Sequence, residues 1–129
     1  MTKQILVVDD DAQTRVLIGL MMQRSGYRVV EAFDGLSALR MLDFITPDLM
    51  IIDLMMPGMD GAELCRRARL RNNTLTTPII VFTASVSSRL DHHARQCGAN
   101  EYLPKTNPPD DLPRLVNGLL GLTTANHSI

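Results

Sequence analysis

The feature of this sequence that most constrains its fold is a set of four short apolar runs, each followed directly or closely by polar side chains. Longer segments of helical period separate the runs, and this alternation predicts βαβ units around a parallel sheet. Because parallel strands end at the same edge of a sheet, we expect three carboxylates, a hydroxyl and an ammonium to converge where open α/β sheets bind ligands. The runs cover residues 5–8, 49–52, 79–82 and 102–103, and the polar residues after them are Asp9, Asp10 and Asp11, then Asp53, then Thr83, then Lys105.

The length and charge of the chain limit the classes of function. The 129 residues suffice for one domain with a single core, which we expect over residues 1–122, with residues 123–129 as a flexible tail. A formal net charge of -1 argues against a general nucleic-acid or membrane-surface binder. No apolar stretch reaches the roughly 20 residues that span a bilayer, and the N-terminus has no signal-peptide pattern. These features predict a cytoplasmic protein.

Five strands and five helices are expected to account for most of the chain. Asp34 is a candidate N-cap of the second helix, and Gly26 is a candidate stop for the first. Pro113 is tolerated only in a first turn, so the last helix should begin near Asp110. The thin apolar stripe of the fourth helix, residues 88–97, predicts looser packing than in the other helices. The residues expected to face the core are, helix by helix, Val16, Leu17, Leu20 and Met21; Leu36, Leu39 and Leu42; Leu64, Cys65 and Ala68; Leu90, Ala94 and Cys97; and Leu112, Leu115, Val116, Leu119 and Leu120.

Three acidic side chains crowded at one sheet edge need a partner, because crowding raises the pKa values of carboxyl groups and lowers stability. A hard divalent cation, Mg²⁺ or Mn²⁺, bound by Asp9, Asp10 and Asp53, is the simplest partner. With such a cation, Lys105 and Thr83 would neutralise and hydrogen-bond phosphoryl oxygens, so the set predicts a phosphoryl-transfer site. A carboxylate can then act as the nucleophile and form an aspartyl phosphate.

The cationic and sulfur-containing residues add further expectations. The chain has 11 arginines but two lysines, Lys3 and Lys105, and a lysine at the sheet edge of so arginine-rich a chain indicates a need for a compact point charge. Cys65 and Cys97 lie at apolar helical positions and are interpreted as reduced, packed thiols rather than a disulfide or metal pair. A basic run on the third helix admits two interpretations, a solvated face or a docking patch, and comprises Arg66, Arg67, Arg69 and Arg71.

Four segments of the sequence resemble those of the receiver domains of bacterial two-component response regulators. Their order and spacing match from Lys3 to about Leu120, and the four together are specific where each alone would be weak. The resemblance implies a flavodoxin-like, doubly wound (βα)5 fold with a five-stranded parallel sheet in the order 2-1-3-4-5, of which the family's chemotaxis member is a standard example. The segments are Ile5–Asp11, Pro47–Gly61, Pro78–Ala84 and Gly98–Lys105.

The same resemblance implies a role for each polar residue at the sheet edge. Asp53 would be the phosphoacceptor, assisted by Lys105 and Thr83, and its donor would be a histidine kinase or a phosphotransfer protein. Such a protein is a signalling phosphoacceptor that catalyses at most its own phosphorylation and dephosphorylation, rather than an enzyme. The implied Mg²⁺ ligands are Asp10, Asp53 and the backbone carbonyl of Met55, with Asp9 acting through a water molecule.

The resemblance also implies how the signal would leave the site. Thr83 and Tyr102 would form a switch pair, in which Thr83 moves toward the phosphoryl group and Tyr102 swings inward behind it. The output surface would be the fourth helix, fifth strand and fifth helix, facing a downstream target or output domain, with dimerisation on phosphorylation as a hypothesis. No membrane contact and no direct nucleic-acid binding by this domain is implied, and Asp11 receives no ligand role.

The residue after the active-site lysine departs from the family pattern. The family usually has a proline there, commonly with a cis bond, whereas Lys105 is followed by Thr106 and preceded by Pro104. A cis bond without proline costs roughly 2.5–4 kcal/mol. We therefore expect either a trans Lys105–Thr106 bond with an altered loop or a strained exception.

Two other classes of protein share part of this pattern. A phosphatase or phosphotransferase with an aspartate nucleophile would share the chemistry, but its best-known fold has a second Asp where this chain has Met55. A flavodoxin-like cofactor binder needs a phosphate-cradling loop after the first strand, where this chain has three acidic residues that repel phosphate unless a metal intervenes. A phosphorylation-controlled signalling module is the preferred interpretation.

Overall fold

The chain folds into five strands, β1 (Gln4–Val8), β2 (Arg28–Ala32), β3 (Leu49–Ile52), β4 (Ile79–Thr83) and β5 (Glu101–Pro104). Its helices are α1 (Ala12–Arg24), α2 (Gly35–Met41), α3 (Gly61–Arg69) and α5 (Asp111–Leu119), with a 3-10 helix, η1 (Asn72–Thr74). This computed structural model describes residues 2–84, 92 and 95–121, and every count refers to them. All five strands pair in parallel in the order β2-β1-β3-β4-β5, which confirms the predicted flavodoxin-like fold.

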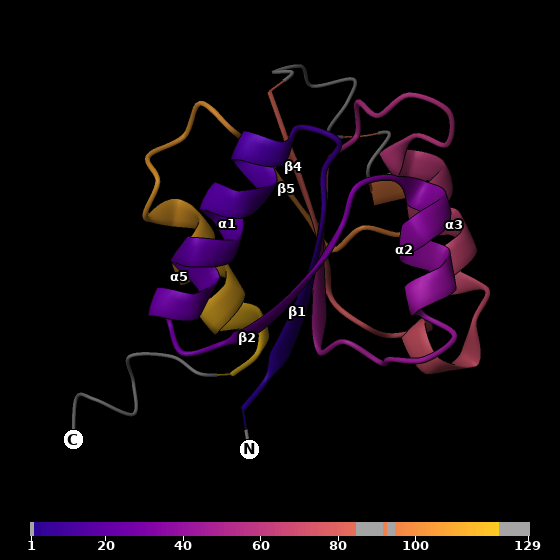
Figure 1. Ribbon diagram of the computed structural model, residues 1–129, viewed down its shortest axis with the longest axis horizontal. Coiled ribbons are helices and arrows are strands. Elements are labelled where there is room, and N and C mark those ends of the chain that lie inside the picture. Colours follow the sequence, from indigo (N-terminus) through magenta and orange to yellow (C-terminus); the bar gives the residue numbers. More distant parts are fainter. Residues whose placement is uncertain (1, 85–91, 93–94, 122–129) are drawn as a thin grey trace.

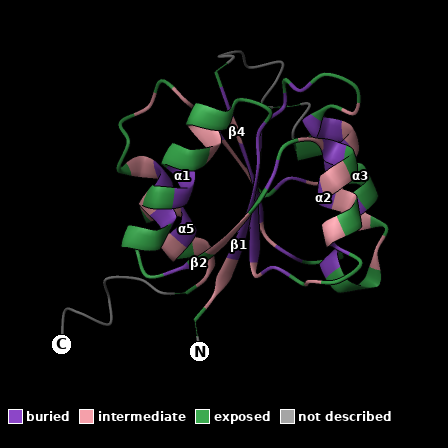
Figure 2. Cartoon of the chain, viewed as in Figure 1, coloured by how far each residue is buried: buried purple, intermediate pink, exposed green. Residues whose placement is uncertain are grey.

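The central strands are buried on both faces, because alternate residues enter two separate cores. Helices α1 and α5 cover one face of the sheet, and α2 and α3 cover the other (Figure 1). Leu6 and Met50 belong to the core beneath α2 and α3, whereas Ile5 and Ile51 belong to the core beneath α1 and α5. Figure 2 shows the resulting burial along β1. This double burial explains why the strands are continuous apolar runs rather than alternating ones.

The predicted helix boundaries are confirmed where the structure describes them. The Asp34 side chain accepts from the backbone N–H of Ser37 and completes a capping box at the start of α2. Gly26 follows the end of α1 with φ at 94°, a left-handed conformation that glycine adopts without strain. Asp110 is the N-cap of α5, which places Pro113 in the first turn of that helix.

The predicted inner face of α1 is wrong for three of its four residues; the fourth, Met21, packs against the core beneath α1 and α5. Val16, Leu17 and Leu20 are exposed to 49%, 59% and 50%, whereas Ile18 and Met22 are buried. Residues 16–22 are apolar almost all round the helix, so their periodicity does not select one face. Gly19 is also buried and allows α1 to approach β2 closely. An exposed apolar strip therefore runs along the outer side of α1.

The other predicted helical faces agree with the structure more closely. In α2, Leu42 is buried and Leu39 packs against the core, but Leu36 is 52% exposed and Ala38 takes the inward position. The fourth helix expected over residues 88–97 lies for the most part outside the described residues. The inner faces of α3 and α5 are confirmed: Leu64, Cys65, Ala68, Leu112 and Val116 are buried, and Leu115, Leu119 and Leu120 pack against the core.

Candidate functional site

The carboxyl end of β1 supplies Asp9, which at 1% exposure is the most deeply buried acid among the described residues. Its side chain accepts a hydrogen bond from the backbone N–H of Asp11, with Oδ1 at 2.9 Å. Its second carboxylate oxygen, Oδ2, lies 2.8 Å from Lys105 Nζ. Its backbone carbonyl accepts a third bond, at 2.8 Å, from Nη1 of Arg15. All three oxygens of this residue are therefore engaged.

The carboxyl end of β3 brings Asp53 to the same place. The Asp53 backbone N–H donates to the carbonyl of Val8 at 3.0 Å, so the ends of β1 and β3 lie side by side. The carboxylates of Asp9, Asp10 and Asp53 offer oxygen atoms that lie within 4.8 Å of one another. Asp9 and Asp53 are buried, and Asp10 is exposed. The predicted convergence of the three acids is confirmed.

Lys105 reaches this cluster from the segment that follows β5. Its backbone N–H donates to the carbonyl of Thr83 at 2.7 Å, which holds it beside the end of β4. The ammonium lies nearer to Asp9 Oδ2, at 2.8 Å, than to Asp53 Oδ2, at 3.7 Å. The Lys105–Thr106 peptide bond is trans, which excludes the strained cis exception. The missing proline leaves the lysine within reach of both acids.

Thr83 ends β4 and is fully buried. Its hydroxyl lies near enough to the Asp53 carboxylate to favour the ionised form weakly, yet it completes no hydrogen bond with any described residue. An unpaired buried hydroxyl costs about 1–3 kcal/mol. It is therefore a donor without an acceptor, held beside the candidate nucleophile.

The environment of Asp53 favours its neutral form. Burial is the largest cause and raises the pKa of the Asp53 carboxyl; the positive charge of Lys105 opposes the rise, and the negative charge of Asp9 adds to it. Lys105 offsets burial incompletely because its ammonium lies against Asp9. A carboxylate with a raised pKa is also a more basic nucleophile than an exposed one.

Replacing Asp53 with asparagine should therefore stabilise the metal-free protein at neutral pH. The folded-state pKa lies above the ordinary 3.8, so the folded chain binds more protons, and stability falls as pH rises through and above that value. Urea unfolding at several pH values should show a gain for Asp53→Asn that is full at pH 7 and vanishes below pH 3.8. Asp110→Asn, at an exposed N-cap without a side-chain bond, is the control. A neutral-pH loss in Asp53→Asn would contradict the expectation.

Two residues of the site region were not predicted to have a local structural role. Asp11 received no ligand role, and it caps α1 by accepting from the backbone and side chain of Thr14. Arg15 connects α1 to β2 through an ion pair with Glu31, at 3.0 Å, besides its bond to Asp9. The Asp-x-x-Thr spacing at residues 11–14 is a capping signal that could have identified the first of them.

Met55 and Tyr102 take positions compatible with the expected roles but do not test them. The Met55 side chain is 61% exposed, and its backbone N–H donates to Asp53 Oδ1 at 3.4 Å. Tyr102 lies half-buried on β5, opposite Val81 of β4, and packs against the core beneath α2 and α3.

The basic run divides into two parts: Arg66 and Arg67 lie on an exposed face of α3, as a solvated face predicts, whereas Arg69 and Arg71 contact other elements. Arg66 and Arg67 pair with Glu63, both at 2.8 Å, and Arg71 pairs with Asp43. Arg69 donates to the carbonyls of Gly98 and Thr74 and to the side chain of Asn100. The run therefore connects the end of α3 to neighbouring loops. Cys65 and Cys97 are both buried in the core beneath α3, and no disulfide joins them.

The donor set fits a hard divalent cation. The three acids offer only oxygen ligands, and one acid is open to solvent, as Mg²⁺ requires when it keeps several waters. The unpaired Thr83 hydroxyl fits an additional oxygen-rich ligand next to that ion. The Asp9, Asp10 and Asp53 carboxylates could therefore hold Mg²⁺ or Mn²⁺.

The fold and this edge of acids, lysine and threonine define a class of protein. The response regulator receiver domain family matches residues 5–117, and the chain belongs to this family. Response regulator MprA of Mycobacterium ulcerans is 40% identical over 125 residues, which cover 95% of this chain and 52% of MprA. The alkaline phosphatase synthesis transcriptional regulatory protein PhoP of Bacillus subtilis is 36% identical over 120 residues, covering 93% of this chain and 49% of PhoP.

One solved structure with this fold contains a metal ion. The receiver domain of the sensor histidine kinase PA1611 from Pseudomonas aeruginosa has a magnesium ion coordinated in its active site cleft; the TM-score is 0.86 at 30% identity, covering 94% of this chain and 99% of that domain.

The chain spans about half the length of the curated relatives that it matches. Receiver domains of two-component response regulators are signalling modules rather than enzymes. Within the described residues, every helix is too short or too polar to cross a membrane.

Proposed function

We propose that this chain is a phosphorylation-activated receiver, one domain over residues 1–122, that accepts a phosphoryl group on Asp53 in a Mg²⁺-dependent reaction. The observation that supports this most directly is the joint placement of a buried Asp53, two further acids and Lys105 at one sheet edge. The donor is a histidine kinase or a phosphotransfer protein, and the setting is cytoplasmic. The chain itself catalyses no more than its own phosphorylation and dephosphorylation.

The proposed transfer requires one displacement at phosphorus and a small shift of the Lys105 side chain. A carboxylate oxygen of Asp53 attacks the phosphorus of a phosphohistidine; the new P–O bond forms as the P–N bond breaks, and the electron pair of that bond leaves with the imidazole. Asp10, Asp53 and the Met55 carbonyl would hold Mg²⁺, with Asp9 acting through a water molecule, and the ion would supply positive charge to the phosphoryl oxygens. Lys105, 3.7 Å from Asp53 Oδ2, shifts its flexible side chain onto one such oxygen.

The unpaired Thr83 hydroxyl provides the first step of the response. It gains an acceptor when Asp53 becomes phosphorylated, so phosphorylation favours a position of Thr83 closer to that group. Tyr102, on the neighbouring strand, then moves inward into the space behind Thr83. The two side chains form the switch pair that connects the site to β5 and α5.

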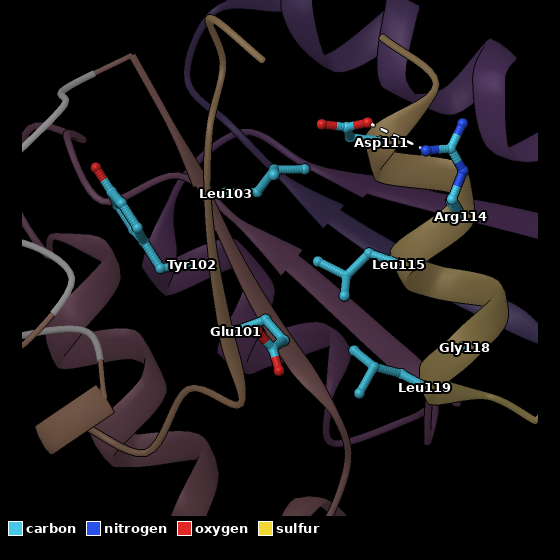
Figure 3. A pocket seen from close by; sticks show the side chains of 8 residues that line it. All are labelled: Glu101, Tyr102, Leu103, Asp111, Arg114, Leu115, Gly118 and Leu119. Atoms are coloured by element: carbon cyan, nitrogen blue, oxygen red, sulfur yellow. Dashed lines mark ion pairs between the residues drawn. The ribbon is translucent and has the colours of Figure 1, made fainter. Parts of the chain in front are cut away.

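The surface that changes includes the groove between β5 and α5. Figure 3 shows Leu103 of β5 and Leu115 and Leu119 of α5 pointing into this groove, while Tyr102 extends away from α5. The ion pair of Asp111 and Arg114 lies at one end of the groove. A movement of Tyr102 therefore alters β5 from the opposite side. A target protein, an output domain or a second phosphorylated copy binds to this groove. The binding surface also includes the fourth helix expected over residues 88–97, most of which lies outside the described residues.

The phosphodonor binds on the other side of the site, along α1. The exposed strip of Val16, Leu17 and Leu20 continues into a groove that reaches Phe82 and Lys105. An apolar helix face beside the phosphoryl-accepting edge of the sheet can pack against a helix of the donor protein. The phosphohistidine on that helix would then lie next to Asp53. Donor binding would explain why Val16, Leu17 and Leu20 are apolar although they do not pack in the core.

Intact mass after incubation with a small acyl phosphate and Mg²⁺ tests the proposed function. We expect one added phosphoryl group in the wild type, none after chelation of the metal and none in Asp53→Asn, because the variant keeps the shape of the site without its nucleophile. Asp110→Asn, at an exposed position at the start of α5 without a side-chain cap bond, should be phosphorylated like the wild type.

Two outcomes would contradict this proposal. Addition that persists in Asp53→Asn would assign the acceptor to another residue. No addition from the acyl phosphate or from a phosphohistidine protein would show that this chain is a receiver without phosphoacceptor activity.

A further inference from the structure

Arg15 is the one arginine whose side chain contacts both the acidic turn and a neighbouring strand within the described residues. It lies in the first half of α1, and its side chain is only 17% exposed. Nη1 donates to the backbone carbonyl of Asp9 at 2.8 Å, and Nε pairs with Glu31 Oε1 of β2 at 3.0 Å. Two nitrogens of one rigid guanidinium thus hold two elements of the fold at a fixed separation.

The bond to Asp9 fixes more than Asp9 itself. The Asp9 carbonyl belongs to the peptide unit that precedes the Cα of Asp10, and Arg15 holds that unit. The Asp11 N–H belongs to the peptide unit that follows the same Cα, and it donates to Asp9 Oδ1 at 2.9 Å. The two peptide units that flank the Cα of Asp10 are therefore both restrained by hydrogen bonds that do not involve the Asp10 side chain.

Asp10 needs such support more than the other two acids do. Asp9 and Asp53 are buried at 1% and 6% exposure, whereas Asp10 is exposed and gains little from surrounding packing. An exposed carboxylate loses rotational freedom when it binds an ion, and a fixed backbone reduces how much freedom remains to be lost. The direction of its Cβ is then set before any ligand arrives.

We propose that Arg15 is a positioning residue for the metal site: through the Asp9 carbonyl and Glu31 it fixes the backbone of Asp10 so that the Asp10 carboxylate faces Asp9 and Asp53. This inference rests on the proposed function, because it assumes a divalent cation at the three acids. Arg15 contacts neither the ion nor the phosphoryl group. Its contribution is geometric and belongs to the unphosphorylated protein.

The charge of Arg15 acts in the opposite direction, which makes the inference testable. A guanidinium close to a cation site repels the cation, so removing its charge would tighten binding if charge were its only effect. Lysine keeps the charge but is a point donor without the fork that spans Asp9 and Glu31. Arg15→Lys therefore removes the geometry and preserves the electrostatics.

Calorimetric titration with MgCl₂ of the full chain separates these effects. We expect Arg15→Lys to weaken Mg²⁺ binding by about tenfold, the lower end of the loss found when an outer-shell partner is removed. Glu31→Gln keeps an oxygen acceptor without charge and should give a smaller loss. Arg24→Lys, an exposed arginine in the last turn of the same helix, should bind as the wild type does.

Two further measurements keep a folding defect apart from a positioning effect. Urea unfolding gives the folded fraction of each variant, so the affinity is reported for folded protein alone. In the metal-free state the amide resonances of Asp10 and Asp11 should shift in Arg15→Lys and stay in place in Arg24→Lys. A merely structural role would lower stability and leave both the affinity and these resonances unchanged.

The possible failures are distinct. Equal Mg²⁺ affinity in Arg15→Lys and the wild type overturns the role of Arg15 and leaves the proposed function standing. Tighter Mg²⁺ binding by Arg15→Met, with unchanged affinity in Arg15→Lys, would show that Arg15 affects the site only through its charge. That result also overturns the positioning role. Absence of Mg²⁺ binding in the wild type overturns the metal site and this inference together.

Discussion

Replacing Gly61 with alanine is expected to lower the free energy of unfolding by about 3 kcal/mol, the upper end of the range for overpacking a buried site. Gly61 is the first residue of α3, and its backbone N–H donates to the carbonyl of Leu54 at 3.0 Å. An added Cβ would overlap the carbonyl oxygen of Asp53 and lie 2.8 Å from the Cα of Leu54. These are backbone atoms, so the overlap is relieved only if the loop that holds Asp53 moves.

Urea unfolding of Gly61→Ala and Gly118→Ala measures this effect against a matched control. Gly118 lies in α5, and a Cβ there would meet nothing within 4 Å, so alanine should stabilise the protein by about 0.5–1 kcal/mol. Gly61→Ala should also lose Mg²⁺-dependent phosphorylation, because Asp53 is displaced, while Gly118→Ala should keep it. Equal stability changes of the same sign in the two variants would contradict the backbone overlap.

Replacing Lys105 with methionine is expected to destabilise the metal-free protein by about 3 kcal/mol, since removing one partner of a buried ion pair leaves the other charge uncompensated. The side chain of Asp9 is 2% exposed and that of Lys105 19%, so water replaces the ammonium poorly. Asp53 lies in the same cluster, which adds repulsion to the loss of a hydrogen bond. Phosphorylation of Asp53 should fall as well, because the ammonium no longer reaches a phosphoryl oxygen.

Lys3→Met is the natural control, because Lys3 is the other lysine of the chain. It should change stability by less than about 0.5 kcal/mol, as surface substitutions usually do. The double variant Asp9→Asn with Lys105→Met should recover most of the lost stability, since it removes both charges, yet it should remain poor in phosphorylation. A double variant as unstable as Lys105→Met would show that the ion pair is not the cause.

The sheet and its site could be predicted largely because both depend on strands. The apolar runs are short, and those of β1 and β3 are buried throughout, so their C-terminal ends are readable. Parallel pairing then brings Asp9, Asp53 and Thr83 together without further information. Lys105 was predicted for the same reason. Caps at Asp34 and Asp60 depend on local side-chain bonds and were equally accessible to sequence reasoning.

The parts that could not be predicted depend on contacts between distant elements. The face of α1 was assigned wrongly because residues 16–22 are apolar on both sides of the helix. The buried side is the one that carries Gly19, which allows α1 to approach β2 closely. Arg15 has no local pattern that reveals its bonds to Asp9 and Glu31, because the second partner lies on β2. The roles of Met55 and Tyr102 remain predictions from resemblance to the family.

The order of the strands makes one side of the site easier to open than the other. The acids follow β1 and β3, which have a neighbouring strand on each side, whereas Lys105 follows β5, which in the described sheet pairs with β4 at the edge. Edge elements open locally at a smaller free energy than central ones. An opening confined to β5 and α5 withdraws the ammonium from Asp9 while the rest of the sheet stays folded. In the metal-free protein, compensation of the Asp9 charge by Lys105 therefore depends on β5 staying paired with β4. A cation bound by the acids that follow β1 and β3 would compensate the same charge without β5.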